Sequence, residues 1–298
     1  MTTIIIEQPN RKLWLAAIKP PMYTVAVIPI WVGSTIAFAQ TKIFNIQIFA
    51  VFLTSAILFI AWMNVSNDVF DDDTGIDQNK AHSVVKLTGN KSLTFWIANL
   101  CLITGILGVS LISWWQRDIT VMVLVLVASA IAYTYQGPPF RLGYQGLGEI
   151  ICLICFSMVV VAAYYSQAQT WSIVSFAAAM IVAIATSLIL FCSHIHQVKD
   201  DLAAGKRSPI VRLGTKKASQ ILPWFGGSIY ALTALFVVLR IFPVATLLVF
   251  LSLPLAIKLF RHVHNYHDQP AKVSNSKFIA VAMHFLMGSL LGVGFLIN

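Results

Sequence analysis

Apolar stretches recur along the whole chain, and short polar loops separate them. Each stretch is close to the ~20 residues that an α-helix needs to cross the hydrocarbon core of a bilayer. Charged residues make up 10% of the 298 residues, whereas soluble globular proteins contain roughly 25%. The sequence therefore predicts an all-α, polytopic membrane protein. The predicted spans are residues 21–39, 43–63, 93–115, 119–135, 147–166, 171–193, 219–240, 243–260 and 278–297.

The distribution of lysine and arginine predicts the orientation of this bundle. With nine spans, seventeen of the twenty Lys and Arg residues fall on the side of the N-terminus, and Lys42, Arg117 and Arg240 fall on the other side. Cytoplasmic loops carry an excess of Lys and Arg, so we expect a cytoplasmic N-terminus and nine spans rather than eight or ten. The same topology accounts for the net charge of +9 without a nucleic-acid partner. We expect an integral protein of a plasma or thylakoid membrane.

Two loops on the predicted cytoplasmic side contain most of the acidic residues. NVSNDVFDDDTGID begins at Asn64, HIHQVKDDLAAGKRSPIVRLGTKKA begins at His194, and together they hold seven of the eleven Asp and Glu residues. The tripeptide Val-Lys-Leu follows the first loop sequence at 85–87. A similar tripeptide, Val-Arg-Leu, lies in the second loop at 211–213, 126 residues later. Four predicted spans lie between the two, and an even number returns the chain to the same side. We therefore expect a single domain, 1–298, with an internal repeat of residues 20–145 and 146–270.

Clustered carboxylates predict a cation between them. Five aspartates within ten residues repel one another unless a positive charge lies among them, and carboxylate and amide oxygens are ligands that Mg²⁺ prefers. Lysine and arginine side chains in the same loops are suited to phosphate. Acids that bind Mg²⁺ beside bases that bind phosphate are the pattern expected for a diphosphate bridged by a metal ion. The bases are Lys80, Lys86, Lys91, Lys199, Lys206, Arg207 and Arg212.

The first loop carries a motif that resembles the UbiA superfamily of membrane-embedded prenyltransferases. Asn67, Asp68 and Asp71 match its Asn-Asp-x-x-Asp signature. Asp77 matches the longer spacing to a further Asp that is usual for members that use naphthoate. Asp72 and Asp73 are extra to this pattern, and one interpretation is that they face water.

The second loop departs from the second signature of the family, which is Asp-x-x-x-Asp followed by Gly and Val-Arg-Leu-Gly. Asp201 takes the place of the second Asp, whereas the first falls on Gln197. The pair Lys199-Asp200 instead resembles the family's Arg-Asp with intervening residues deleted, and residues 210–214 match the end of the signature. Asp200 and Asp201 are therefore both candidates, and which of them binds metal stays open.

A third stretch, 134–149, resembles the branch of the family found in cyanobacteria and plastids, as does the stretch 19–29. This resemblance implies transfer of a phytyl or other polyprenyl group from its diphosphate to 1,4-dihydroxy-2-naphthoate, with loss of CO₂ and diphosphate, in phylloquinone or menaquinone biosynthesis. It also implies a UbiA-type helical bundle in the lipid bilayer, with Mg²⁺ as the cofactor. The length of the prenyl chain and the oligomeric state stay open.

The resemblance further implies roles for individual residues. The catalytic residues would be Asp71, Asp77, Asp201, Tyr133 and Tyr135. The two tyrosines would stabilise an allylic cation through their ring faces, although aromatic residues at this depth also form interfacial belts. The implied metal ligands are Asn67, Asp68, Asp71, Asp77, Asp200 and Asp201. The implied contacts to the prenyl diphosphate are Lys19, Lys86, Lys199 and Arg212.

Alternative interpretations stay open at this point. Within the family, the acceptor could instead be homogentisate, 4-hydroxybenzoate or chlorophyllide. A transporter would place ionisable residues within its spans, whereas these acids lie at span ends. His194 and His196 flank the second motif and either position a substrate carboxylate, act as bases for the reaction, or are structural residues at a helix end. Glu149 opens a predicted span, where a helix N-terminus favours an acid without any catalysis.

Overall fold

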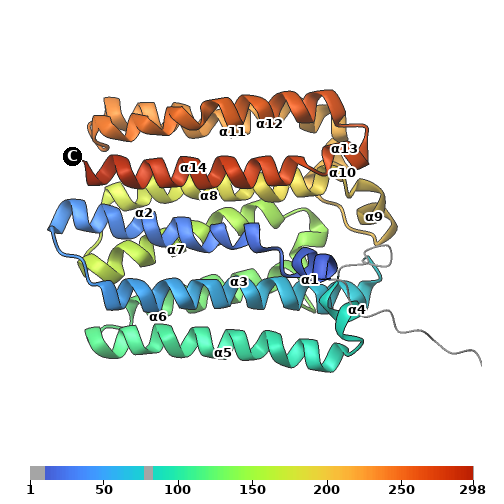
Figure 1. The fold of residues 1–298 in the computed structure, drawn as a ribbon, viewed down its shortest axis with the longest axis horizontal. Helices are drawn as coiled ribbons and strands as arrows, with labels where there is room; N and C mark the ends of the chain where they lie inside the picture. Colours follow the sequence, from blue (N-terminus) through green and yellow to red (C-terminus); the bar gives the residue numbers. More distant parts are fainter. Residues whose placement is uncertain (1–10, 77–82, 298) are drawn as a thin grey trace, which may run out of the picture.

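The computed structural model describes residues 11–76 and 83–297, and all regular structure within them is helical. Long helices run side by side, and successive ones alternate in direction along the bundle (Figure 1). This confirms the predicted all-α fold. The elements are α1 (Arg11–Ile18), η1 (Pro20–Tyr23), α2 (Thr24–Thr41), α3 (Ile46–Thr74), α4 (Val84–Thr88), α5 (Lys91–Gln116), α6 (Thr120–Gln136), η2 (Leu142–Gln145), α7 (Gly148–Ala168), α8 (Ile173–Ile195), α9 (Val198–Ala203), α10 (Pro209–Leu213), α11 (Thr215–Val238), η3 (Val244–Ser252), α12 (Leu253–Tyr266), α13 (Pro270–Val273) and α14 (Ser276–Leu296), where η denotes a 3₁₀ segment.

Eight segments in the described part of the chain are long and apolar enough to cross a membrane. They contain α2, α3, α5, α7, α8, α11, α12 and α14. The remaining predicted span, 119–135, corresponds to α6, whose 17 residues lie at the short end of the range for membrane helices. The predicted span 243–260 contains two types of helix, since η3 is followed directly by α12. Pro254 lies in the first turn of α12 and has no backbone N–H to donate.

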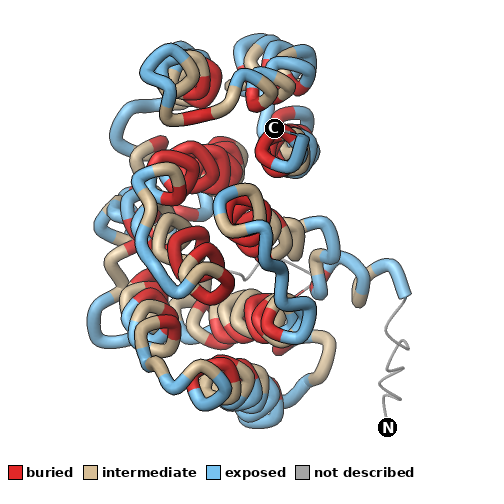
Figure 2. Tube along the Cα trace, turned by 90° about the vertical axis from the view of Figure 1, so that its left-hand side faces the viewer, coloured by how far each residue is buried: buried red, intermediate tan, exposed pale blue. Residues whose placement is uncertain are grey.

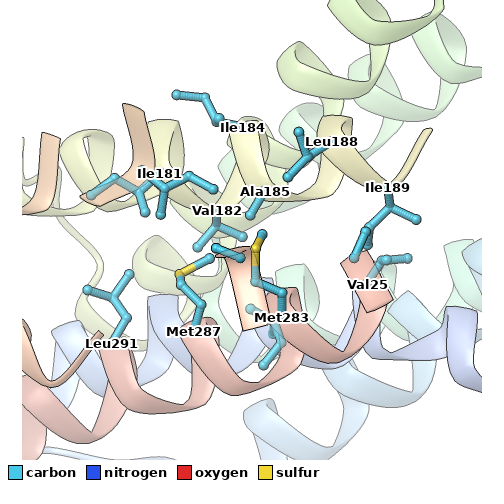
Figure 3. Close-up of a cluster of buried hydrophobic side chains, with 14 of the residues drawn as sticks. Val25, Ile181, Val182, Ile184, Ala185, Leu188, Ile189, Met283, Met287 and Leu291 are labelled. Atoms are coloured by element: carbon cyan, nitrogen blue, oxygen red, sulfur yellow. The ribbon is translucent and has the colours of Figure 1, made fainter. Parts of the chain in front are cut away.

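The core of the bundle is built around α8, which is the most buried of the eight segments. Figure 2 shows buried positions concentrated on the central helices, with exposed positions on the outer ones. In Figure 3, Ile181 and Val182 of α8 lie beside Met283 and Met287 of α14 in the largest cluster of buried side chains. The outer faces carry large exposed apolar side chains, such as Trp224. Such a surface is expected where lipid surrounds the protein.

The short elements gather at one end of the bundle, opposite the C-terminus (Figure 1). They are α1, α4, α9, α10 and α13. The two matched tripeptides lie in α4 and α10, which are both five-residue helices that end at a glycine with positive φ, Gly89 and Gly214. This likeness agrees with the predicted internal repeat, which stays a prediction.

Candidate active site

A cavity of about 700 Å³ reaches both acidic motifs. Its polar end is lined by Asn67, Asp68 and Asp71 from α3 and by Asp200 and Asp201 from α9. From there it extends between α3, α6, α7 and α8 to apolar side chains in the middle of the bundle, including Phe59, Val125, Phe156, Val159 and Ile189. Such a cavity fits a ligand that has a polar head and an apolar tail.

The first motif lies on a helix because α3 continues from the predicted end of the span at residue 63 to Thr74. Side chains three and four residues apart share one face of a helix. Asn64, Asn67 and Asp71 accordingly line the cavity together. Asn67 and Asp71 share this face as their spacing requires, whereas Asp72, which is eight residues after Asn64, is not among the described residues that line the cavity with it.

Asp72 and Asp73, the two aspartates extra to the motif, are not among the described residues that line the cavity. Both form ion pairs with Lys91 at the start of α5, and their side chains are 39% and 41% exposed. Ion pairs as exposed as these contribute little to stability. The two carboxylates therefore face water beside a lysine, and of the three consecutive aspartates only Asp71 lines the cavity.

Asp68 borders the cavity but is held by the protein itself. Its carboxylate is 1% exposed, and one oxygen lies 3.6 Å from Nζ of Lys19. The other oxygen accepts a hydrogen bond of 2.8 Å from the backbone N–H of Val84. Lys19 also lines the cavity and has a φ of 53°, in the left-handed region that residues other than glycine rarely adopt. Asp68 thus fixes the start of α4 and positions a lysine at the polar end.

The two aspartates of the second motif have different surroundings. Asp201 is 1% exposed, its Oδ1 lies 3.5 Å from Nζ of Lys206, and its Oδ2 accepts a hydrogen bond of 3.0 Å from Ser208. Asp200 is exposed and lines the cavity. Asp201 therefore holds Lys206 and Ser208 in the loop that follows α9. Asp200 is the more accessible of the two carboxylates for a ligand.

The turn η2 connects the two motifs. The hydroxyl of Tyr144 lies 2.7 Å from that of Thr74 at the end of α3, and the carbonyl of Tyr144 accepts a hydrogen bond of 2.8 Å from the N–H of Arg207. Burial raises the pKa of the Tyr144 hydroxyl, which therefore stays protonated. Arg212, a predicted diphosphate contact, donates instead to the carbonyls of Arg207 and Gln145 at 3.1 and 2.8 Å. It is not among the described residues that line the cavity.

Other predicted contacts to the diphosphate also lie away from the cavity. Lys86 on α4 and Lys199 on α9 are exposed and do not belong to the described lining of the cavity. Asp77, a predicted metal ligand, and Lys80 lie outside the described residues. The roles of these four residues stay predictions.

The two predicted aromatic residues are placed differently. Tyr133 donates a hydrogen bond of 2.9 Å to the carbonyl of Pro138 and is not part of the described cavity wall. Tyr135 is 8% exposed and lines the cavity. Its ring is tightly enclosed, because a Cβ atom added at Gly143 or Gly148 would approach its Cε2 to 2.5 or 2.7 Å. The geometry favours Tyr135 for contact with a substrate.

Three lysines line the polar end of the cavity, and the sequence pointed clearly to only one of them. Lys19 was predicted, Lys206 was noted only as a base in the second loop, and Lys277 was not considered for the site. Lys277 lies at the start of α14, where its sequence neighbours carry no motif. Burial, and then the positive charge of Lys277, lower the pKa of His196 to about 4. His196 is therefore neutral at physiological pH.

Some buried polar atoms around the cavity lack a hydrogen-bond partner within the described structure. They include Nδ2 of Asn64, Oε1 of Gln136 and Nδ1 of His196, and all three residues line the cavity. Buried polar groups in proteins are nearly always hydrogen-bonded. The cavity is therefore suited to a ligand that carries polar groups of its own.

The oxygen atoms at the polar end fit a hard cation that is shared with a ligand. The part of the chain that the structure describes contains no group of three or more His, Cys, Asp or Glu side chains placed to hold a metal ion by themselves. Mg²⁺ is usually held by one or two carboxylates and completes its shell with water and phosphate oxygens. Asn67, Asp71 and Asp200 supply such oxygens to one cavity from two elements.

Known proteins are similar to this chain along almost its whole length. The profile of the UbiA prenyltransferase family matches residues 26–287. The chain is 58% identical to the 2-carboxy-1,4-naphthoquinone phytyltransferase of Synechocystis sp., over 96% of this chain and 94% of that protein. Its fold matches the apo structure of a UbiA homolog from Aeropyrum pernix K1 with a TM-score of 0.70 at 15% identity, over 94% and 98% of the two chains. A UbiA homolog from Archaeoglobus fulgidus bound to DMAPP and Mg²⁺ matches with a TM-score of 0.54 at 16% identity, over 94% and 99% of the two chains.

Proposed function

This chain belongs to the UbiA prenyltransferase family, and on that basis we propose that it transfers a phytyl or similar polyprenyl group from its diphosphate to 1,4-dihydroxy-2-naphthoate, with release of CO₂ and diphosphate. The observation that carries this proposal is the cavity, which has both acidic motifs and three lysines at one end and an apolar wall beyond them. The 58% identity to a naphthoquinone phytyltransferase supports the choice of acceptor.

The polar end of the cavity would bind the diphosphate of the donor. Lys19, Lys206 and Lys277 line this end and would neutralise negative charge on the leaving group as its C–O bond breaks. Mg²⁺ would be held by Asn67, Asp71 and Asp200, as the oxygen ligands indicate, and when bound it adds positive charge at the diphosphate. The solved homolog bound to DMAPP and Mg²⁺ supports this assignment through its shared fold.

The apolar part of the cavity would hold the isoprenoid chain and exclude water from the allylic cation. Phe59, Val125 and Val159 line this part, and a site without water protects a reactive cation from hydrolysis. The enclosed ring of Tyr135 belongs to the wall of the same cavity. Its π face would stabilise the positive charge of the cation.

The position of the acidic residues favours an enzyme over a transporter. Transporters place ionisable residues near the middle of the membrane at broken helices. In this chain the two motifs lie at the end of α3 and on α9, beyond the end of α8, with an apolar cavity running inward from them. The arrangement suits a substrate that inserts its tail from one side.

We place the acidic end of the cavity on the cytoplasmic side of a plasma or thylakoid membrane. With the nine spans predicted from the sequence, seventeen of the twenty Lys and Arg residues fall on the side of the acidic motifs. Lys42, Arg117 and Arg240 follow α2, α5 and α11 at the other end. An excess of positive charge is typical of the cytoplasmic side.

The proposal is tested with membranes that contain the protein, supplied with Mg²⁺ and phytyl diphosphate. The acceptors 1,4-dihydroxy-2-naphthoate, homogentisate, 4-hydroxybenzoate and chlorophyllide are added separately, and prenylated products are identified by mass spectrometry. Of the four acceptors, we expect only the naphthoate to give a product, and we expect no product when EDTA removes the metal. A product from another acceptor alone would contradict the naphthoate assignment, and no product from any of them would contradict prenyl transfer.

A further inference from the structure

We propose that Tyr135, His194 and Glu149 form a proton relay that takes a hydroxyl proton from the aromatic acceptor during prenyl transfer and returns it afterwards. The inference rests on the proposed function and assigns a general base to that reaction. The three side chains come from three different helices, α6, α8 and α7.

Two contacts link the three side chains, with His194 in the middle. Oε1 of Glu149 lies 2.9 Å from Nδ1 of His194, and Nε2 of His194 lies 3.5 Å from the hydroxyl of Tyr135. His194 and Tyr135 line the cavity, whereas Glu149 is not among the described residues of its wall. The side chains of His194 and Glu149 are 2% and 11% exposed. Catalytic hydrogen bonds are often long before substrate binds, so the 3.5 Å contact is compatible with proton transfer.

The carboxylate of Glu149 sets the direction of the relay. With Glu149 ionised, Nδ1 of His194 carries the proton, and Nε2 is left as an acceptor toward Tyr135. Glu149 is the second residue of α7, where the N-terminal end of the helix dipole stabilises negative charge. Its Oε2 has no hydrogen-bond partner within the described residues. A carboxylate so placed stabilises the imidazolium that forms when His194 accepts a proton.

The surrounding structure holds the three groups in place. The ring of Tyr135 packs against Gly143 and Gly148, where an added Cβ atom would lie 2.5 or 2.7 Å from its Cε2. The hydroxyl of Ser187 on α8 donates a hydrogen bond of 2.9 Å to the carbonyl of Glu149, which fixes the start of α7 against α8. Such support keeps the relay in place before the substrate binds.

Other titratable groups also lie near the relay. Cys152 on α7, His196 after α8, and the acids Asp71 and Asp201 line the same cavity. Within the described residues, only Glu149 and Tyr135 lie within hydrogen-bond distance of the His194 ring. The base is therefore assigned to His194.

The chemistry of the acceptor requires a group that holds one proton temporarily. When C2 of the naphthoate attacks the allylic cation, a C–C bond forms and positive charge develops on the hydroxyl of C1. That proton passes to the oxygen of Tyr135 while the proton of Tyr135 passes to His194, and C1 becomes a ketone. The electron pair of the C2–carboxylate bond then moves toward this ketone as CO₂ leaves, and the naphtholate oxygen recovers the proton. The relay returns to its starting state.

The test uses Tyr135→Phe, which keeps the ring and removes only the hydroxyl, together with Glu149→Gln. Tyr230→Phe is the matched control, because Tyr230 is also buried and its hydroxyl contacts Ser252 at 2.9 Å outside the described cavity wall. Product formation is measured in membranes from pH 6.5 to pH 10. We expect Tyr135→Phe to lower kcat at pH 7 about 100-fold, as loss of general base catalysis does, with the KM for phytyl diphosphate unchanged.

The pH profile separates the relay from a structural role of Tyr135. Aromatic hydroxyls ionise near pH ~10, and an acceptor that has already lost its proton needs no base. We therefore expect the deficits of Tyr135→Phe and Glu149→Gln to shrink at least about tenfold toward pH 10, whereas Tyr230→Phe keeps the wild-type profile. A Tyr135→Phe variant with wild-type kcat at pH 7, or with a deficit that is constant across the range, would overturn the relay. Failure of the wild-type protein to form product would contradict the proposed function instead.

Discussion

The hydroxyl of Tyr144 lies 2.7 Å from the hydroxyl of Thr74, so the turn η2 is tied to the end of the helix that carries the first acidic motif. The same tyrosine accepts a backbone hydrogen bond from Arg207 in the second loop. The two motifs are far apart in the sequence, and η2 holds them at one cavity. The effect of this turn on catalysis can be measured by removing the hydroxyl of Tyr144.

Tyr144→Phe is expected to lower kcat for prenyl transfer about 3- to 10-fold. This factor corresponds to the loss of one hydrogen bond with a net free energy of roughly 0.5–1.5 kcal/mol. Thr74→Val should have a similar effect, because it removes the partner. Since the two side chains share one interaction, the double variant should be no worse than either single variant. Additive losses in the double variant would show that the contact does not couple the motifs.

Asp71→Asn and Asp73→Asn should differ strongly, although the residues are neighbours. Asp71 lines the cavity and Asp73 pairs with Lys91 outside it. We expect Asp71→Asn to reduce product formation at least about 100-fold, because it removes a carboxylate proposed to hold Mg²⁺ at the diphosphate end. Asp73→Asn and Lys91→Met should each stay within about 3-fold of wild type. The comparison is made in membranes with equal amounts of protein, and equal losses at Asp71 and Asp73 would contradict the assignment of faces on α3.

Gly148→Ala should impair catalysis because the added Cβ would lie 2.7 Å from Cε2 of Tyr135. The ring must shift, and displacement of a reacting group by about 1 Å can cost roughly 100-fold in rate. Gly227→Ala in α11 is the control, because no atom lies within 4 Å of its added Cβ. Turnover of both variants is measured beside their recovery from membranes. A Gly148→Ala variant with normal turnover would show that the position of Tyr135 does not matter.

Lys206→Met should destabilise the protein, because it leaves Asp201 buried without its cation. Breaking a buried pair in this way costs about 3–5 kcal/mol, which is observable as a lower melting temperature in detergent. Combining it with Asp201→Asn should recover much of the stability but not the activity. Lys199→Met, at an exposed position of α9, is the control for loss of a lysine. Melting of Lys206→Met at the wild-type temperature would contradict a structural pairing with Asp201.

Much of the fold could be predicted from the sequence, because the length of apolar stretches and the spacing of residues on a helix depend only on neighbouring residues. Long apolar stretches require membrane helices, and the spacing of Asn67 and Asp71 requires a shared face once α3 is helical there. The extension of α3 to Thr74 was harder to predict, because polar residues at a span end are compatible with a loop as well as with a helix.

The parts of the site that the sequence did not reveal depend on tertiary contacts. Lys277 comes to the cavity only because α14 packs against α2 and α8. Arg212 occupies a position that the resemblance assigns to diphosphate, yet its hydrogen bonds go to backbone carbonyls in the adjacent loops. Glu149 was explained by its place at a helix N-terminus, and its contact with His194 became visible only when α7 and α8 were seen side by side.

The central claim is that the cavity joins a prenyl group to the carbon of the naphthoate that carries the carboxylate. It is tested most directly with 1,4-dihydroxy-2-naphthoate labelled with ¹³C in that carboxylate, incubated with the protein, Mg²⁺ and phytyl diphosphate. We expect one labelled CO₂ for each diphosphate released, together with an unlabelled prenylated product, and neither from Asp71→Asn. A prenylated product that keeps the label, or labelled CO₂ released without the donor, would contradict it.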